Sequence, residues 1–289
     1  MPSTMTASRA HGRLRLRFTQ DAEGRTRLTD RAQEPPLQVV RAFDLPDGAS
    51  LVHLHNVSGG VLGGDHLETV VEVGPGAQAQ LTTTGATRVY RPRASDQTAV
   101  QATTVQVGAG GLLEWLPDPL IPFAGARFRQ EARITLASGA GLFWWETVAP
   151  GRVAHGEVFA YHCLEIALDV WAEGRFIARE RTRLEPSPRP LTSPARLGLY
   201  RHFCTFYICR IGEPSARWTT LEAELSVMAQ ELSVPGDCLW GVSALPAHGL
   251  SVRGLSRTGR DLPPRLLLFW QAAKRALYGR AALPPRKVY

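Results

Sequence analysis

Apolar and polar residues alternate with period two through much of the first half of the chain. The alternation is clearest in the segments 51–57 and 67–73, the segments 77–84 and 99–108 follow, and 110–117 is a further short apolar run. Successive side chains of a β-strand point to opposite faces of a sheet, so such alternation predicts strands that bury one face. Each of these segments is therefore predicted to be a strand.

Two longer segments are each predicted to form a β-hairpin. In 127–149 the turn is placed at the sequence Ser-Gly-Ala-Gly, and in 159–186 it is placed between Ala172 and Gly174. Glycine adopts the positive φ angles that tight hairpin turns require. Together with the preceding strands, these segments predict a mainly β fold.

Helices are expected only late in the chain. In 218–232 the apolar residues Leu221, Leu225, Met228 and Leu232 recur at helical spacing after a threonine that could serve as the N-terminal cap. Between 185 and 198 a proline-rich segment without apolar periodicity predicts an extended connection from the strands to this helix.

A second helix is predicted from Pro264 to Tyr278, with proline at its start and Gly279 after its end. An amphipathic arrangement puts one set of residues on its apolar face and leaves three basic residues outside that face. The apolar set is Leu266, Trp270, Ala273 and Leu277, and the basic set is Arg265, Lys274 and Arg275. The apolar face could close the chain's own core or dock a partner, and the sequence leaves both open.

Length and composition limit the class of protein. The 289 residues are 44% hydrophobic, enough for a substantial core. No apolar run approaches the ~18 residues of a membrane span, and the N-terminal region lacks the apolar core of a signal peptide. We therefore expect a cytoplasmic protein without membrane association, with reduced cysteines and with disorder in residues 1–8.

The formal net charge of +7 is concentrated near the C-terminus. Nine Lys and Arg residues but one acid, Asp261, follow residue 251, so residues 1–251 carry a net charge of −1. Such a basic end suits an acidic protein partner or nucleic acid. Its aromatic residues are chiefly Phe269, Trp270 and Tyr278, which fall within the predicted helix, where core packing explains them, so we predict no nucleic-acid binding.

Two glycine pairs precede an acidic residue in the sequence Asn-Val-Ser-Gly-Gly-Val-Leu-Gly-Gly-Asp-His, which begins at Asn56. A phosphate-binding loop is excluded, because the Lys-Ser/Thr ending is missing and a strand follows instead of a helix. The glycines most simply allow a tight turn before that strand. Asp65 could then be a turn aspartate or, with His66, a metal-ligating pair of the kind that a metal-dependent hydrolase uses.

Acids also interrupt otherwise apolar segments at Glu114, Glu146 and Glu157. Burying a carboxylate without a partner is costly, so pairing with arginines such as Arg88, Arg152 or Arg175 is the simplest explanation of each. Together these acids could instead line a path for a divalent cation. We expect at least one of them to face an internal cavity.

Other candidate sites are weaker. His53 and His55 share one face of a predicted strand, but no further ligand stands at a suitable spacing beside them. His202, Cys204 and Cys209 could approach one another, although the apolar residues between them favour buried thiols. No Gly-x-Ser-x-Gly nucleophile motif occurs, so a serine hydrolase has little support.

Five motifs in a fixed order carry a family resemblance that spans residues 51–286. They are SGGVLGGD, GAQAQLTTTGATRVYR, LEWLPDPLIPFAGA, GRVAHGEVF and GRAALPPR. In this order they resemble the urease accessory protein family UreD, also called UreH. The resemblance implies a non-enzymatic maturation factor in a hetero-oligomeric complex that works with UreF and the GTPase UreG to deliver nickel to apo-urease.

The resemblance also implies a fold and a set of residues. The expected fold is a single large domain over 1–289 with β-helix-like stacked strands, a few helices in the C-terminal third and a basic C-terminal helix and tail at 262–289. The motif residues that carry over are Asp65, Thr82, Thr83, Tyr90, Glu114, Pro117, Gly156 and Glu157.

A tentative nickel path follows from combining the resemblance with the isolated acids. Nickel accepts oxygen and imidazole ligands, and transfer requires weak, exchangeable sites, so we expect transient nickel and no stably bound cofactor. The path residues are predicted to be Asp65, Glu114, Glu146 and Glu157. Asp65 is expected at the mouth of the route, as an exposed carboxylate whose removal leaves the fold intact.

Overall fold

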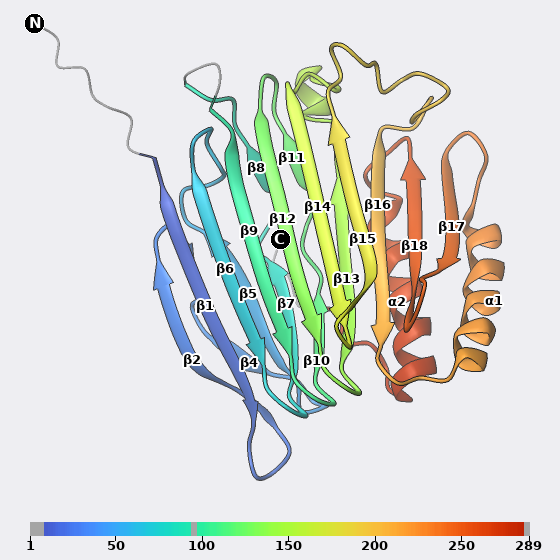
Figure 1. The fold of residues 1–289 in the computed structure, drawn as a ribbon. Helices are drawn as coiled ribbons and strands as arrows, with labels where there is room; N and C mark the ends of the chain where they lie inside the picture. Colours follow the sequence, from blue (N-terminus) through green and yellow to red (C-terminus); the bar gives the residue numbers. More distant parts are fainter. Residues whose placement is uncertain (1–8, 94–96, 286–289) are drawn as a thin grey trace, which may run out of the picture.

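The computed structural model describes residues 9–93 and 97–285. Residues 1–8, for which disorder was predicted, and the last four residues of the predicted tail lie outside the described residues. Two β-sheets lie face to face, and two α-helices pack on the second sheet (Figure 1). This arrangement confirms the mainly β, stacked-strand fold with helices late in the chain. No helix in the described ranges combines the length and the hydropathy needed to cross a membrane.

The front sheet has seven strands. In spatial order they are β15 (Arg175–Leu184), β14 (Cys163–Ala172), β12 (Arg127–Leu136), β9 (Ala99–Val107), β6 (His66–Val73), β1 (His11–Gln20) and β2 (Thr26–Glu34).

The rear sheet runs, in spatial order, through β17 (Cys238–Ala244), β18 (Gly249–Ser256), β16 (His202–Arg210), β13 (Gly141–Val148), β10 (Leu112–Trp115), β7 (Gln78–Thr83), β5 (Ser50–Asn56) and β3 (Leu37–Gln38). Short strands β4 (Ala42–Asp44), β8 (Thr87–Val89) and β11 (Leu120–Pro122) pair at its margins. The helices are α1 (Ser215–Leu232) and α2 (Leu262–Tyr278), and a 3-10 turn covers Val153–His155.

Most strands pair in parallel because the chain alternates between the two sheets. It passes from β5 in the rear sheet to β6 in front, then to β7, β9, β10, β12, β13 and β14 in turn. Each strand therefore pairs with the strand that lies one circuit earlier, as β9 does with β6 and β7 does with β5. This is the β-helix-like stacking that the family resemblance implied.

The predicted hairpin over 127–149 is wrong. β12 pairs with β9 and β14 in the front sheet, whereas β13 pairs with β10 and β16 in the rear sheet. The turn at Gly139 (φ 68°) therefore joins the two sheets. β12 exposes every second side chain, but β13 is buried on both faces, so the two strands belong to different layers.

The second hairpin is confirmed. β14 and β15 pair antiparallel around a turn in which Glu173 and Gly174 have φ angles of 51° and 73°. Two consecutive residues with positive φ match the twist of the flanking strands.

β1 and β2 were not predicted. In β1 the buried residues Leu14, Leu16 and Phe18 alternate with arginines that point to solvent. Arg13 and Arg17 lie 3.0 Å and 2.7 Å from the carboxylates of Glu68 and Glu72 on β6. The basic N-terminal run is thus one face of a strand that pairs in parallel with β6.

Both helices form close to the predicted positions, with one correction at a start. α1 begins at Ser215 after Pro214, so the expected threonine cap is wrong. Its residues Leu221 and Leu225 are buried in the layer between the helices and the rear sheet. Met228 and Leu232 only pack partly against that layer.

α2 has proline in its first turn, and Gly279, whose φ is 64°, caps its C-terminal end. The predicted apolar face is buried, because none of its four residues exposes more than 2% of its surface. This face therefore closes the chain's own core. Lys274 was predicted to lie outside the buried face of this helix. That prediction is wrong, because the residue is only 1% exposed.

The connection after β15 also differs from the prediction. Residues 185–198 form successive turns instead of an extended segment. Leu191 is 2% exposed within a core cluster that includes Phe128 and Leu164, so one buried side chain draws the connection back onto the sheets.

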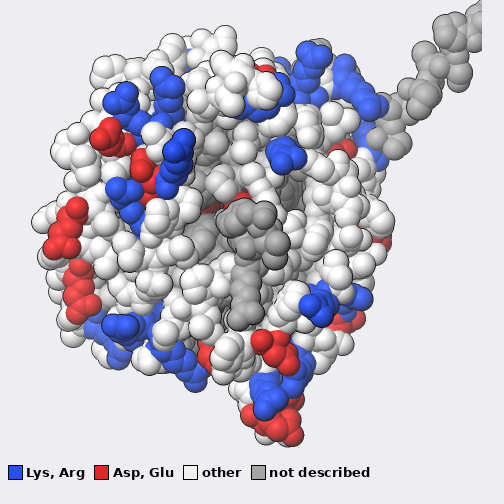
Figure 2. Space-filling model, turned by 180° about the vertical axis from the view of Figure 1, so that it is seen from behind, with Lys and Arg blue, Asp and Glu red and all other residues white. Residues whose placement is uncertain are grey.

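The positive charge near the C-terminus does not form one surface. Lys274 is buried, the Arg265 guanidinium lies 3.4 Å from the Asp261 carboxylate, and that of Arg253 lies 3.6 Å from Glu180. Figure 2 shows that Lys and Arg side chains on the rear face lie in separate groups. The location in the sequence therefore did not determine where the charge lies in space.

Candidate functional site: a polar cavity between the sheets

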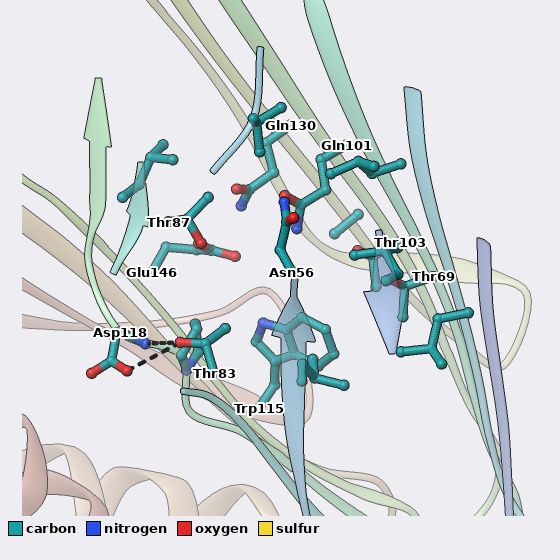
Figure 3. A pocket seen from close by; sticks show the side chains of 18 of the residues that line it. Asn56, Thr69, Thr83, Thr87, Gln101, Thr103, Trp115, Asp118, Gln130 and Glu146 are labelled. Atoms are coloured by element: carbon teal, nitrogen blue, oxygen red, sulfur yellow. Dashed lines mark hydrogen bonds between the residues drawn. The ribbon is translucent and has the colours of Figure 1, made fainter. Parts of the chain in front are cut away.

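A partly open cavity of about 70 Å³, lined by both polar and apolar residues, lies between the two sheets. Its polar lining comes from both layers, as Figure 3 shows. The front sheet supplies Thr69, Gln101, Thr103 and Gln130, and the rear layer supplies Asn56, Thr83, Thr87, Trp115, Asp118 and Glu146. This volume holds a few water molecules, and the polar groups can bind them.

The regular register of the front sheet brings the polar residues together. Thr69 pairs with Thr103, and Gln101 pairs with Gln130, on neighbouring rungs of the sheet. Strand alternation turns all four side chains toward the rear sheet. Beyond these rungs the inward positions are apolar, as at Val105 and Ile134, so the polar part of the interior is confined to one region.

Of the four predicted path acids, Glu146 of β13 lines this cavity, which confirms that at least one of the isolated acids faces an internal cavity. The Trp144 indole Nε1 donates a hydrogen bond to Glu146 Oε1 at 3.1 Å. Burial raises the pKa of Glu146 from 4.5 to about 7, although hydrogen bonds from Gln130 and Trp144 oppose the rise. A carboxyl group with this pKa can exchange a proton for a cation near neutral pH.

A second acid, Glu180 of β15, lies beside this region and was missed in the sequence. In the register of the front sheet, Glu180 pairs with Leu168, Leu168 pairs with Ala132, and Ala132 pairs with Thr103, which lines the cavity. Glu180 accepts a hydrogen bond from the Tyr207 hydroxyl of the rear sheet, and its charge contributes to the raised pKa of Glu146. The sequence signal that could have identified Glu180 was a single acid, among several arginines, at a position of the strand whose side chain points toward the rear sheet.

Asp65 does not line the cavity, and the expectation of an exposed carboxylate is wrong. Asp65 is 6% exposed, and its two carboxylate oxygens accept hydrogen bonds from the backbone N–H groups of Ala10 at 3.0 Å and Leu62 at 2.8 Å. It therefore ties the glycine turn to the start of β1.

The glycine pairs explain why Asp65 is drawn inward. A Cβ atom at Gly63 would lie 2.6 Å from the Cα of Pro92, and Gly64 has a φ of 93°. Only glycine suits this close approach and this positive φ. The neighbouring His66 is exposed on β6, with its ring 6.3 Å from that of His11, so Asp65 and His66 do not face a common cleft.

Glu114 lies on the opposite face of the rear sheet from the cavity. Its carboxylate accepts hydrogen bonds from Gln80 Nε2 at 3.0 Å, Trp270 Nε1 at 2.9 Å and Lys274 Nζ at 3.2 Å. The next residue, Trp115, lines the cavity instead. Strand alternation therefore separates Glu114 from the proposed route.

Glu157 follows the 3-10 turn and is not in a strand, contrary to the prediction. The expected pairing with Arg152 is confirmed, because Arg152 Nε donates to Glu157 Oε2 at 2.9 Å. The backbone N–H of Ala124 donates to the same oxygen at 3.0 Å. These bonds hold the pKa of Glu157 below its usual value.

The predicted acids thus occupy four separate environments. No group of three or more His, Cys, Asp or Glu residues in the described parts of the chain is placed to hold a metal ion. His55 lines the cavity. Cys204 and Cys209 are buried thiols, and burial raises the pKa of each to about 12.

Comparison of the sequence with known families places the chain in a class of accessory proteins. The family model described as UreD urease accessory protein matches residues 10–289. A urease accessory protein UreD from Herpetosiphon aurantiacus is 49% identical over 289 residues, covering all of both chains.

Two further relatives carry the same description. The UreD from Deinococcus radiodurans is 34% identical over 96% of this chain and 94% of its own. The UreD from Dechloromonas aromatica is 35% identical over 96% and 93% of the two chains. The chain belongs to the UreD family of urease accessory proteins, and its role lies in urease maturation.

Proposed function

We propose that this chain is a non-enzymatic, cytoplasmic scaffold that, with UreF and UreG, binds apo-urease and passes nickel to it through the cavity between the sheets. Family membership supports the link to urease. The observation that carries the nickel route is Glu146, an acid with a pKa of about 7 that faces the cavity between the sheets.

The lining suits transfer better than storage. Threonine and glutamine oxygens, the imidazole of His55 and the carboxyl of Glu146 are ligand types that Ni²⁺ accepts. Each is a weak ligand when single, and the cavity also has room for water. A cation can therefore exchange ligands stepwise, while Glu146 releases its proton as the ion arrives and recovers it afterwards.

Glu180 extends the proposed route to the flank of the molecule. It lies on the last strand of the front sheet, and its side chain is 18% exposed beside Arg253. A cation that enters here would meet Glu180 first and Glu146 second. Asp65, Glu114 and Glu157 have structural partners instead, so we place the route at Glu146 and Glu180.

Replacement of Glu146 by glutamine tests this function. Co-expression of Glu146→Gln with UreF, UreG and urease is expected to lower the nickel content and the activity of urease roughly tenfold, because the amide carries no negative charge and cannot exchange a proton for the cation. Nickel per urease is measured by elemental analysis. Glu131→Gln, on the exposed face of β12, is the matched control and should behave as wild type. Normal nickel loading with Glu146→Gln would contradict the route.

The same residue predicts a pH dependence of stability. The folded chain holds the Glu146 proton up to a pKa of about 7, above the ordinary 4.5, so this group destabilises the fold as pH rises through that range. Between about pH 5 and pH 8 the wild type should lose up to about 3 kcal/mol relative to Glu146→Gln. Urea unfolding at each pH measures the difference, and parallel pH profiles would contradict the raised pKa.

Docking of UreF on the C-terminal helix remains part of the proposal. The apolar face of α2 is used in the core, which leaves Arg275 and Arg280 as exposed residues of this segment. Reversing both to glutamate is expected to slow association with UreF, and the effect should shrink as salt rises. Stopped-flow binding at two salt concentrations measures it. An unchanged association rate at low salt would exclude this surface.

A further inference from the structure

One end of the molecule brings together two loops that are distant in the sequence. The turns of 186–201 follow β15, and the loop 257–260 follows β18 (Figure 1). The Arg201 N–H donates to the Ser256 carbonyl at 2.9 Å, and the Gly236 N–H donates to the Tyr200 hydroxyl at 3.3 Å. The two loops therefore form one continuous surface.

This surface is basic and largely without ion pairs. We call it the arginine end, after its exposed residues Arg189, Arg196, Arg201, Arg257 and Arg260. Among the described residues, the only carboxylate within 4.0 Å of these guanidinium groups is that of Asp237, 3.8 Å from Arg257. Figure 2 shows several basic side chains at the upper left of the rear view, with acidic side chains between some of them.

The exposed face of the front sheet shows the opposite arrangement. There, arginines pair closely with acids, as Arg13 does with Glu68 at 3.0 Å and Arg129 does with Glu165 at 2.7 Å. Basic residues on that face are mostly neutralised within the chain. The positive potential of the arginine end is therefore a local property, available to an external anion.

An apolar residue stands within the charged surface. Leu199 is 52% exposed and lies between Arg196 and Arg201 in the chain. The backbone beneath it is held in place, because the Leu197 N–H donates to the carbonyl of the buried Leu191 at 3.0 Å. Because the loop is already ordered, binding of a partner here costs little conformational entropy, which favours specific docking.

We propose that the arginine end docks an acidic segment of a partner protein, with an apolar side chain of that segment placed on Leu199. The proposal rests on the proposed function in one respect, that the chain works within a protein complex. Charge complementarity and the apolar centre favour a protein over nucleic acid. Single strands require exposed aromatic rings, and the exposed aromatic of the described residues, Phe176, lies at the opposite end of the strands.

A matched pair of double variants tests the proposal. Arg196→Glu/Arg201→Glu changes the arginine end, and Arg15→Glu/Arg133→Glu makes the same change in charge at exposed, unpaired arginines of the front sheet. The probe is a short fluorescein-labelled peptide of alternating glutamate and serine with one central leucine. The first variant is expected to bind it about tenfold more weakly than wild type, and the second within about twofold.

Three outcomes would overturn the proposal. They are absence of peptide binding by the wild-type chain, equal losses in both variants, and binding of single-stranded oligothymidine more tightly than the peptide. Urease activation with the same variants separates this inference from the proposed function. Weaker peptide binding by Arg196→Glu/Arg201→Glu, together with normal nickel loading by Glu146→Gln, would support the docking surface and overturn the nickel route. Wild-type peptide binding by Arg196→Glu/Arg201→Glu, together with lower nickel loading by Glu146→Gln, would overturn the docking surface and support the nickel route.

Discussion

Replacement of Lys274 by alanine is expected to lower the free energy of unfolding by about 3 to 5 kcal/mol, because it leaves a buried carboxylate without its counter-charge. Lys274 and Glu114 are 1% and 2% exposed, and Lys274 Nζ lies 3.1 Å from Glu114 Oε1. Lys274 also lies 3.5 Å from Asp47. Urea unfolding at neutral pH, followed by tryptophan fluorescence, measures the loss.

The double variant Glu114→Gln/Lys274→Met is the control for this prediction. It removes both charges and keeps similar volumes, so its loss should be smaller than that of Lys274→Ala. Gln80 Nε2 and Trp270 Nε1 donate to different oxygens of Glu114, so one of the two can still donate to the single amide oxygen of the glutamine. If Lys274→Ala were no less stable than the double variant, the buried ion pair would not be what holds α2 on the sheet.

Replacement of Asp65 by alanine is expected to cost about 2 to 4 kcal/mol, because the backbone N–H groups of Ala10 and Leu62 lose a charged acceptor in a largely buried place. The N-terminal strand should then loosen from the turn. Urea unfolding gives the loss, and hydrogen exchange at Ala10 and Leu62 locates it.

Asp30→Ala is the matched control, since Asp30 is exposed on β2 and should change stability by less than about 0.5 kcal/mol. If Asp65→Ala kept wild-type stability but reduced nickel loading of urease, the structural role would be wrong and the original interpretation as a route carboxylate would return. Lower urease activation in proportion to the lost folded chain fits the structural role.

Part of the candidate site could be predicted from the sequence. Glu146 was recognised because an acid inside an apolar run is costly to bury, and it does face the cavity. Glu114 gave the same signal, but its strand turns it toward α2 and Lys274. Glu180 gave a weaker signal, because neighbouring arginines made it look like a surface residue. A local pattern shows that a residue is unusual and does not show which layer it faces.

The sequence by itself determined the clearly alternating strands, such as β6 and β9, and the end of α2. Period-two alternation, proline in the first turn of α2 and Gly279 after it act through neighbouring residues, so local rules suffice. Only the tertiary structure decided that β12 and β13 lie in different sheets, since the turn at Gly139 can serve a hairpin or a crossing between layers. It also decided that Lys274 is buried, because its partner Glu114 is 160 residues away. Pairing between distant segments depends on the packing of the whole chain, which no local pattern contains.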